Sequence, residues 1–119
     1  MSNFESLKIW NNAREIVKEV YKMMENHKDF GFRDQIQRAA VSIMNNIAEG
    51  KEYGSDKMFN RYLLIAKGSC AEVKSMLYLC EDLGICDAKD ANKLREMIEN
   101  QIHAIQKFIS YINNENNQK

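Results

Sequence analysis

Few side chains in this sequence could bind a metal or carry out acid–base chemistry. Glu99 and His103 come closest, because they are four positions apart, as on one face of a helix. A metal site in a helical bundle, however, needs carboxylates from several helices that converge at one level, together with Glu-x-x-His pairs. Both residues also point away from the apolar stripe of Leu94, Ile98 and Ile105. The sequence therefore predicts no metal and no cofactor.

The three cysteines, Cys70, Cys80 and Cys86, do not form a zinc-binding or catalytic set. Cys70 and Cys80 are ten residues apart, so a helix would rotate them by about 80° from alignment. No Cys-x-x-Cys pair is present, and neither histidine stands in the local signature of a cysteine nucleophile and its base. An odd number of cysteines in helical sequence argues against a disulfide framework. We expect them to pack as small hydrophobic residues.

The most informative polar residues form a row along a predicted helix. The row follows steps of four, three and four, which place its members on one face, and one more asparagine lies beside it. It consists of Arg38, Ser42, Asn45 and Glu49, with Asn46 beside them. Asparagines inside a helix lose about a few tenths of a kcal/mol each relative to alanine, so groups outside the helix are expected to use them. Two uses remain open: hydrogen bonds to a neighbouring helix or subunit, and contact with a ligand or nucleic acid.

A second row lies on the outer side of the next predicted helix. Leu64, Ala71 and Tyr78 recur at steps of seven, and the small residues Gly68 and Ser75 lie between them. The outer side of a helix in an isolated bundle should be charged. Small residues there would let another helix approach closely, with leucine and tyrosine beside it, so the row predicts an oligomer contact. The alternative is ordinary surface, since single apolar residues are common on soluble proteins.

The composition fits one globular domain without a strong charge. The 119 residues include 17 basic and 17 acidic side chains, so the formal net charge is zero. A basic row of Arg14, Lys18 and Lys22 is interleaved with glutamates, which predicts an ion-paired solvated face rather than a nucleic-acid site. No stretch reaches the roughly 18 apolar residues of a membrane span, and residues 1–5 do not resemble a signal peptide. The expected location is the cytoplasm.

Four amphipathic helices are predicted to position these residues. Proline is absent, and glycine falls mostly where the apolar rhythm breaks, which favours long helices. The helices are predicted over about residues 5–26, 33–52, 55–83 and 88–113. Gly84 is expected to close the third helix, and Asp87 to cap the fourth. Short connectors predict an all-α, antiparallel up-down-up-down four-helix bundle over residues 1–113, with a disordered polar tail at residues 114–119.

The predicted core consists of the apolar stripes of these helices. Their members recur at steps of three and four, the period of a helix with one buried face. They are Ile9, Ala13, Ile16, Val17, Val20 and Met24; Ile36, Ala39, Ala40, Ile43 and Ile47; Phe59, Tyr62, Leu63, Ala66, Cys70, Val73, Met76, Leu77, Cys80 and Leu83; and Ala91, Leu94, Ile98, Ile102, Ile105, Ile109 and Ile112.

The segment from Gln35 to Gly50 resembles the signature of the small bacterial four-helix bundle proteins, also called 23S ribosomal RNA intervening-sequence proteins. Its centre reads Ser-Ile-x-x-Asn-Ile-Ala-Glu-Gly, and the resemblance extends to residues 4–10 and 59–72. It implies an antiparallel bundle that assembles into a ring, typically a homopentamer, with an unassigned molecular role. A related group, the accessory proteins of diversity-generating retroelements, resembles the same bundle and associates with a reverse transcriptase and nucleic acid.

Two functional hypotheses follow. The first is a non-enzymatic, ring-forming scaffold whose partner is either RNA or a protein. The second is an enzyme whose site forms only between subunits, with the polar groups of Arg38, Asn45, Asn46 and Glu49. The second lacks an acid–base pair or nucleophile specified by spacing.

Overall fold

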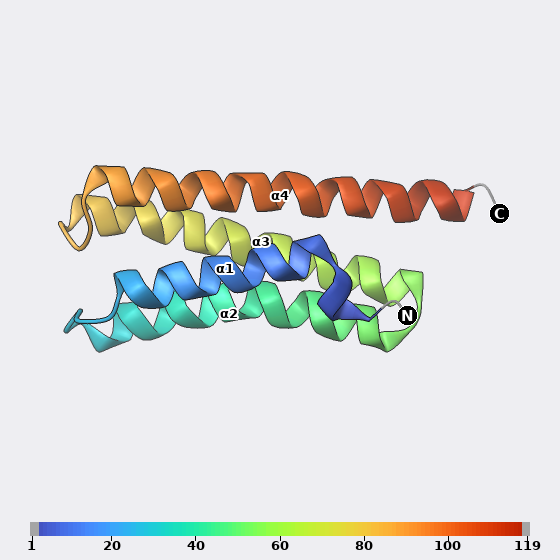
Figure 1. Cartoon of the computed structure of the whole chain (residues 1–119), viewed down its shortest axis with the longest axis horizontal. Helices are drawn as coiled ribbons and strands as arrows, with labels where there is room; N and C mark the ends of the chain where they lie inside the picture. The colour runs from blue at the N-terminus through green and yellow to red at the C-terminus, as the bar shows by residue number, and fades with distance from the viewer. Residues whose placement is uncertain (1–2, 118–119) are drawn as a thin grey trace.

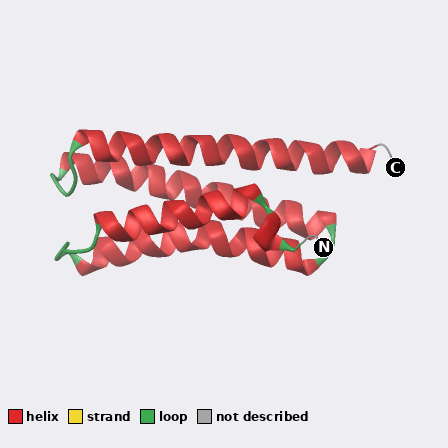
Figure 2. Ribbon diagram, in the orientation of Figure 1, coloured by secondary structure: helices red, strands yellow, loops and turns green. Residues whose placement is uncertain are grey.

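The computed structural model describes residues 3–117, and this part of the chain contains helices and loops but no strand (Figure 2). A short 3-10 turn precedes four α-helices. The elements are η1 (Phe4–Ser6), α1 (Lys8–Met23), α2 (Phe30–Tyr53), α3 (Asp56–Asp82) and α4 (Ala88–Asn117). None of the helices within residues 3–117 combines the length and the apolar character needed to cross a membrane.

The helices run antiparallel along a molecule of 51 × 21 × 20 Å (Figure 1). The α1–α2 and α3–α4 connections lie at one end of the bundle, and the α2–α3 connection lies at the other. The predicted all-α, up-down-up-down four-helix bundle is therefore confirmed.

The C-terminal end of α4 differs from the prediction. Residues 114–117, expected in a disordered tail, continue α4, which projects past the other helices (Figure 1). Residues 118–119 of the predicted tail lie outside the described part of the chain. Residues 114–116 are exposed and therefore bury nothing. The backbone hydrogen bonds of a helix can continue without burial of further side chains. A helix end of this kind has no apolar period and cannot be recognised from the sequence.

Side-chain caps fix the starts of three helices. The sequence offers Ser55 or Asp56 as the cap of α3, and the structure uses Ser55, whose Oγ accepts a hydrogen bond from the Met58 amide at 3.2 Å. The expected cap at Asp87 is confirmed, since its Oδ1 accepts a hydrogen bond from the Asp90 amide at 2.8 Å. Capping by Asp29 also explains why α2 begins about three residues earlier than predicted. Caps of this kind satisfy amides that the first helical turn leaves unpaired.

The turn after α3 forms as the sequence predicts. Gly84 has a φ of 71°, in the left-handed region where glycine has no Cβ penalty. The Ile85 amide donates to the Cys80 carbonyl at 2.8 Å, and the Gly84 amide donates to the Glu81 carbonyl at 3.1 Å. These two bonds form a Schellman motif, which closes the helix and returns the chain toward the core.

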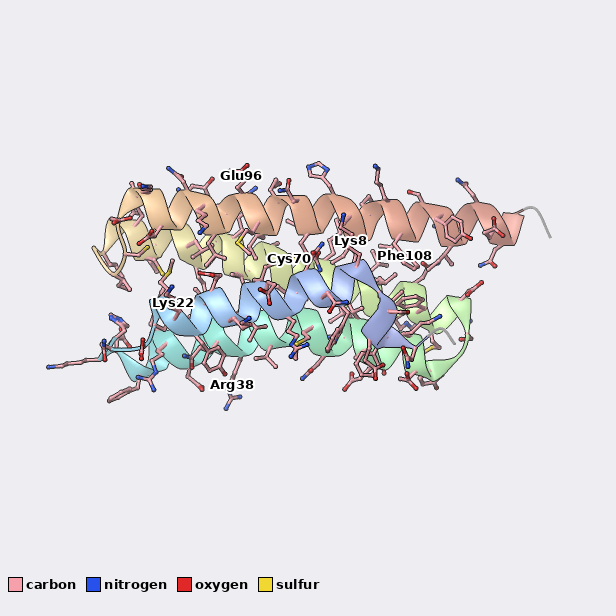
Figure 3. All side chains as sticks on the ribbon, in the orientation of Figure 1. Lys8, Lys22, Arg38, Cys70, Glu96 and Phe108 are labelled. Carbon is pink, nitrogen blue, oxygen red and sulfur yellow. The ribbon has the colours of Figure 1, made fainter. Side chains whose placement is uncertain are left out.

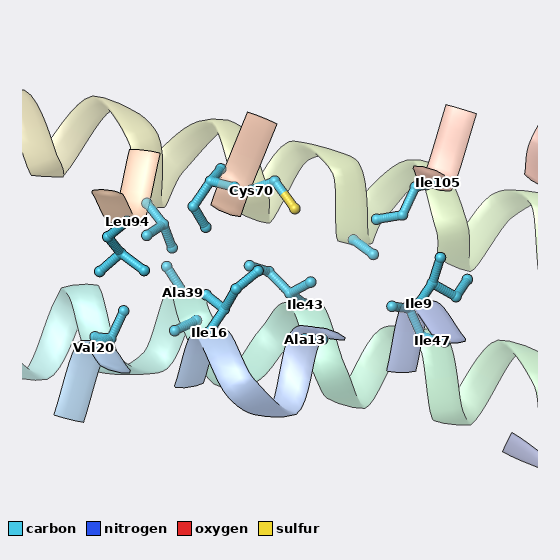
Figure 4. Close-up of a cluster of buried hydrophobic side chains, with 14 of the residues drawn as sticks. Ile9, Ala13, Ile16, Val20, Ala39, Ile43, Ile47, Cys70, Leu94 and Ile105 are labelled. Carbon is cyan, nitrogen blue, oxygen red and sulfur yellow. The ribbon is translucent and has the colours of Figure 1, made fainter. Parts of the chain in front are cut away.

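The core is one cluster of buried hydrophobic side chains from all four helices, part of which Figure 4 shows. Nearly all of the predicted stripe residues are buried. Three of them, Val17, Tyr62 and Ile102, are only partly buried. Leu83 is 60% exposed because it is the cap residue of α3, and Ile85 packs against the core after the turn.

Gly50 lies where α2 and α3 approach each other closely. A Cβ atom built on Gly50 would lie 2.6 Å from the Tyr62 Cβ and 3.1 Å from a Phe59 ring carbon. Carbon atoms do not pack closer than about 3.0 Å, so the Tyr62 side chain would have to move. The Tyr62 Cβ is attached directly to the backbone of α3 and cannot move far unless the helix moves. Gly50 is therefore required by packing between helices rather than by a turn.

We expect the Gly50→Ala variant to lose stability. Overpacking of this kind costs about 1–3 kcal/mol, whereas the gain in helix propensity is at most about 1 kcal/mol. Gly68→Ala is the matched control, because a Cβ on this helical glycine meets nothing within 4 Å. Urea unfolding at low protein concentration should show a lower midpoint for Gly50→Ala and an equal or higher one for Gly68→Ala. Equal midpoints for both variants would contradict the packing argument.

The cysteines pack as the sequence predicts. Cys70 and Cys80 are buried in the core and Cys86 is half-buried, and all three are free thiols. Burial raises the pKa of Cys70 to about 12. Burial, with a smaller contribution from the neighbouring Cys86, raises the pKa of Cys80 to about 12. A thiol with such a pKa has almost no thiolate at neutral pH and is a poor nucleophile.

Alkylation of the folded protein should therefore modify Cys86 first. Iodoacetamide at pH 8 followed by mass spectrometry is expected to add one label, at Cys86, before any other, with Cys70 and Cys80 protected until urea unfolds the chain. A buried thiol combines a low thiolate fraction with poor access of the reagent. Fast labelling of Cys70 in the folded state would show that the core near it opens readily.

Candidate functional site

Ser42 and Asn46, two members of the predicted polar row, belong to a hydrogen-bond network between α2 and α3. The Ser42 and Ser69 hydroxyls are 2.8 Å apart. The Asn46 amide nitrogen donates to the Ser42 carbonyl at 2.8 Å and to Ser42 Oγ at 2.9 Å. All three side chains are partly buried. Ser42 thus bonds to a neighbouring helix, one of the two uses left open by the sequence, whereas Asn46 bonds only to Ser42 of its own helix and not to a group outside α2.

The other three members of the row face solvent. Asn45 and Glu49 are exposed. Arg38 points outward from α2 (Figure 3), and its Nε lies 3.0 Å from Asp34 Oδ2, one turn earlier. An exposed pair of this kind contributes little to stability. The row thus divides into a structural half at the α3 contact and an exposed half on the outer side of α2.

The second predicted row forms the outward side of α3, opposite the core. Leu64 is 56% exposed and Tyr78 is 53% exposed. Gly68, Ala71 and Ser75 are exposed as well, so no element within residues 3–117 covers the row. Ile65 and Leu79, next to it, are also large exposed apolar residues. We call this surface, from Leu64 to Tyr78, the outer face of α3.

Sequence reasoning missed Arg95, which holds one end of this outer face. Arg95 is 9% exposed, and its guanidinium lies 4.3 Å from the centre of the Tyr78 ring. It also donates to Glu81 Oε1 at 2.8 Å and to the side chain of Asn92. Its Nη1 has no hydrogen-bond partner among the described residues. An exposed tyrosine held by a buried cation presents a ring in a fixed position.

Gln101 is a second buried polar residue that the apolar stripes did not predict. It is 1% exposed, and its amide donates to the Ile9 carbonyl at 2.7 Å. This bond ties α4 to the first turn of α1. A signal was present, since Gln101 lies three residues after Ile98 and four before Ile105, within the inward period. A single polar residue at such a position indicates a specific buried partner.

Glu99 is used in an ion pair between helices. Lys74 Nζ on α3 lies 2.8 Å from Glu99 Oε1. The hydrogen bond from Lys74 lowers the pKa of Glu99, and the same bond raises the pKa of Lys74. His103, one turn further along α4, is exposed. Across the described residues, His, Cys, Asp and Glu side chains do not gather in threes that could hold a metal ion.

One surface hollow of about 370 Å³ lies between the end of α1 and the start of α4. Its lining combines apolar side chains such as Met23 and Leu94 with charged ones such as Lys22 and Asp90. Charges of both signs are present, and the Cys86 thiol also lines the hollow. Burial and the nearby carboxylates of Asp87 and Asp90 raise the pKa of Cys86, which leaves it little thiolate to act as a nucleophile. The hollow therefore has no arrangement that specifies a reaction.

Comparison with known structures supports the fold. A crystal structure of a protein with unknown function, from the S23 ribosomal protein family of Bacteroides thetaiotaomicron, superposes with a TM-score of 0.79. The two chains are 21% identical, and the match covers 85% of this chain and 97% of the other. At this identity the likeness concerns the fold. No protein with a curated description matches the sequence.

The sequence also matches a family model over most of its length. The model describes the 23S rRNA-intervening sequence proteins, and it matches residues 5–107. The match includes α1, α2, α3 and most of α4, and with them the Ser42–Asn46 network and the outer face of α3. The chain therefore belongs to the 23S rRNA-intervening sequence protein family.

Proposed function

We propose that this protein is a non-enzymatic, self-associating scaffold in which the outer face of α3 contacts another chain. The observation that carries the proposal is the continuous exposed row from Leu64 to Tyr78, which has small residues at its centre. Contiguous exposed apolar surface marks interaction sites on soluble proteins. The resemblance to ring-forming bundles leads us to propose rings of five chains.

The exposed half of the polar row is the surface that we propose for a further partner. Arg38, Asn45 and Glu49 would recur in every chain of an assembly, and such repetition raises avidity for a partner with repeated sites. Arg38 is paired with Asp34 and Glu49 is acidic, so the surface has no excess of positive charge. This balance favours a protein partner over RNA, which needs uncompensated cations.

The mass of the native protein in solution tests the scaffold. Size exclusion with light scattering, at several concentrations, should give a mass of more than one chain, with five chains for each ring. The ratio of absorbance at 260 and 280 nm should be that of protein alone. A monomer at every concentration would contradict the proposal, and a raised ratio with salt-sensitive binding of structured RNA would shift the partner to nucleic acid.

Substitutions on the outer face provide the matched comparison. Leu64→Glu and Ala71→Glu place charges on the row and should reduce the mass toward a single chain, because a contact would have to bury them. Lys18→Glu on α1 is the control, since it is an exposed charge change away from α3. Circular dichroism should show the same helix content in all variants.

The alternative hypothesis, an enzyme site formed between subunits, would use Asn46 as a polar group. The structure engages Asn46 in bonds to Ser42 instead. Asn46→Ala should therefore lower the free energy of unfolding by about 1–2 kcal/mol, because it removes partly buried hydrogen bonds. Asn45→Ala, at an exposed position, should leave it unchanged or raise it slightly. Urea unfolding measures both. An unchanged stability for Asn46→Ala would reopen a functional role for this residue.

A further inference from the structure

Sulfur-containing side chains come together at the end of the bundle where α1 ends, α4 begins and the α3–α4 connection lies (Figure 1). Met23 from α1, Cys86 from the connection and Met97 from α4 all line the surface hollow of about 370 Å³. Each of these side chains is half-buried and packs against the hydrophobic core. The fold thus brings one thiol and two thioethers to a single hollow from three separate segments.

One thiol and two thioethers form a soft set of ligands. Thiolate and thioether sulfurs suit Cu(I), whereas Mg²⁺, Ca²⁺ and Mn²⁺ are bound by oxygen ligands. Zn²⁺ is bound by thiolates, imidazoles and carboxylates, and methionine is not among its usual ligands. In the described part of the chain, His, Cys, Asp and Glu do not gather in threes, so methionine is what completes this set. The ligand types therefore select Cu(I).

The hollow allows these ligands to converge on one ion. Methionine is unbranched and has three rotatable bonds, so its sulfur adjusts its position easily. The hollow lies at the surface and therefore gives both thioethers room to move and gives an ion a path of entry. Ile85 and Leu94 line the same space. Apolar side chains around a metal limit the access of water, which would otherwise compete with sulfur for the ion.

The charge balance at Cys86 permits the exchange of a proton for Cu(I). Burial, together with the carboxylates of Asp87, Asp90 and Glu81, raises the pKa of Cys86 because these groups oppose a bare thiolate. When Cu(I) binds, the S–H bond breaks, a Cu–S bond forms and the proton leaves to solvent, with no electron transferred. A neutral thiol is replaced by a neutral copper thiolate, so burial does not penalise the product. The carboxylates that hold the proton on the sulfur also attract the incoming ion.

We propose that the hollow between α1 and α4 binds one Cu(I) ion through the Cys86 thiolate and the thioethers of Met23 and Met97. All three ligands belong to one chain, so the site does not depend on how many chains assemble. The bound ion would tie the end of α1 to the start of α4 and to the α3–α4 connection.

Competition with a coloured chelator tests the site. The purified native protein is titrated, without oxygen and with ascorbate as reductant, into the complex of Cu(I) with bicinchoninate. The loss of the chelator's absorbance reports the transfer of Cu(I), and it should end at one ion per chain. Absence of transfer at every excess of protein over chelator would overturn the proposal.

Substitutions of the three ligands locate the ion. Residues that only support a ligand already contribute about 10–100-fold to metal affinity, so loss of the thiolate in Cys86→Ser should weaken binding at least about 100-fold. Met23→Leu and Met97→Leu keep the apolar volume and remove the sulfur, and each should weaken binding at least about tenfold.

Met44→Leu is the matched control for the two methionine variants. Met44 on α2 is also half-buried and packs against the core, but it does not line the hollow. It should leave the affinity for Cu(I) unchanged. Circular dichroism and the mass in solution should be the same for all four variants, so that a loss of binding cannot come from unfolding.

Protection from alkylation gives a readout at the sulfur itself. Ag(I) is a soft ion like Cu(I) and needs no reductant, so one equivalent per chain should slow the reaction of Cys86 with iodoacetamide. The same amount of Zn²⁺ should not. In the double variant Met23→Leu/Met97→Leu, Ag(I) should protect Cys86 less than in the native protein. Equal protection by Zn²⁺ and Ag(I) would contradict a soft site.

The binding data decide between three sulfurs and one. Loss of binding in Cys86→Ser with unchanged affinity in both methionine variants would show that a thiol alone holds the ion, and this would overturn the proposed site. Unchanged affinity in Cys86→Ser would overturn it as well. Graded losses in all three variants, with Met44→Leu unchanged, support it. The scaffold is tested separately by the mass in solution, so neither result decides the other.

Discussion

The close contact between α2 and α3 is the constraint on which the rest of the structure depends. It is fixed at two points, the missing side chain of Gly50 against Tyr62 and the hydroxyl pair of Ser42 and Ser69. These points are eight residues apart on α2, about 12 Å along its axis. Two contacts at this separation prevent α3 from sliding along α2 or rotating about its own axis. Packing by apolar side chains alone tolerates such adjustments more easily.

The orientation of α3 decides which residues the molecule exposes. Ser69 on one side faces α2, and Lys67 and Lys74 on the other side face α4. The positions midway between these two sides have no neighbour in the bundle. Leu64 and Tyr78 lie there, so their exposure follows from the α2–α3 register and from the cross-links to α4. The proposed interaction surface is thus a consequence of contacts that occur on the opposite flanks of the same helix.

Features that depend on local chemistry or on the spacing of apolar residues could be predicted from the sequence. Features that depend on a contact with a residue far away in the sequence could not. The buried stripes and the caps at Ser55 and Asp87 follow from nearest neighbours along a helix. The burial of Gln101 and Arg95 depends on Ile9 and Tyr78, which are far away in sequence. The end of α4 was missed because residues 114–116 are exposed and leave no apolar period in the sequence. The two candidate rows were found by period, but only the fold separates Ser42 and Asn46 from their exposed neighbours.

The motif at residues 42–50 contains both residues with contacts inside the chain and residues that face solvent. Within residues 42–50, Ser42 and Gly50 contact α3 directly, and Asn46 bonds to Ser42 within α2. Asn45 and Glu49 lie on the same helix but face solvent, and packing gives no reason for their chemical type. A motif of this kind combines two requirements, one for the fold and one for the surface. Because α2 is locked to α3, Asn45 and Glu49 hold a fixed position relative to the outer face of α3. Any assembly built on that face therefore sets the spacing at which these side chains recur.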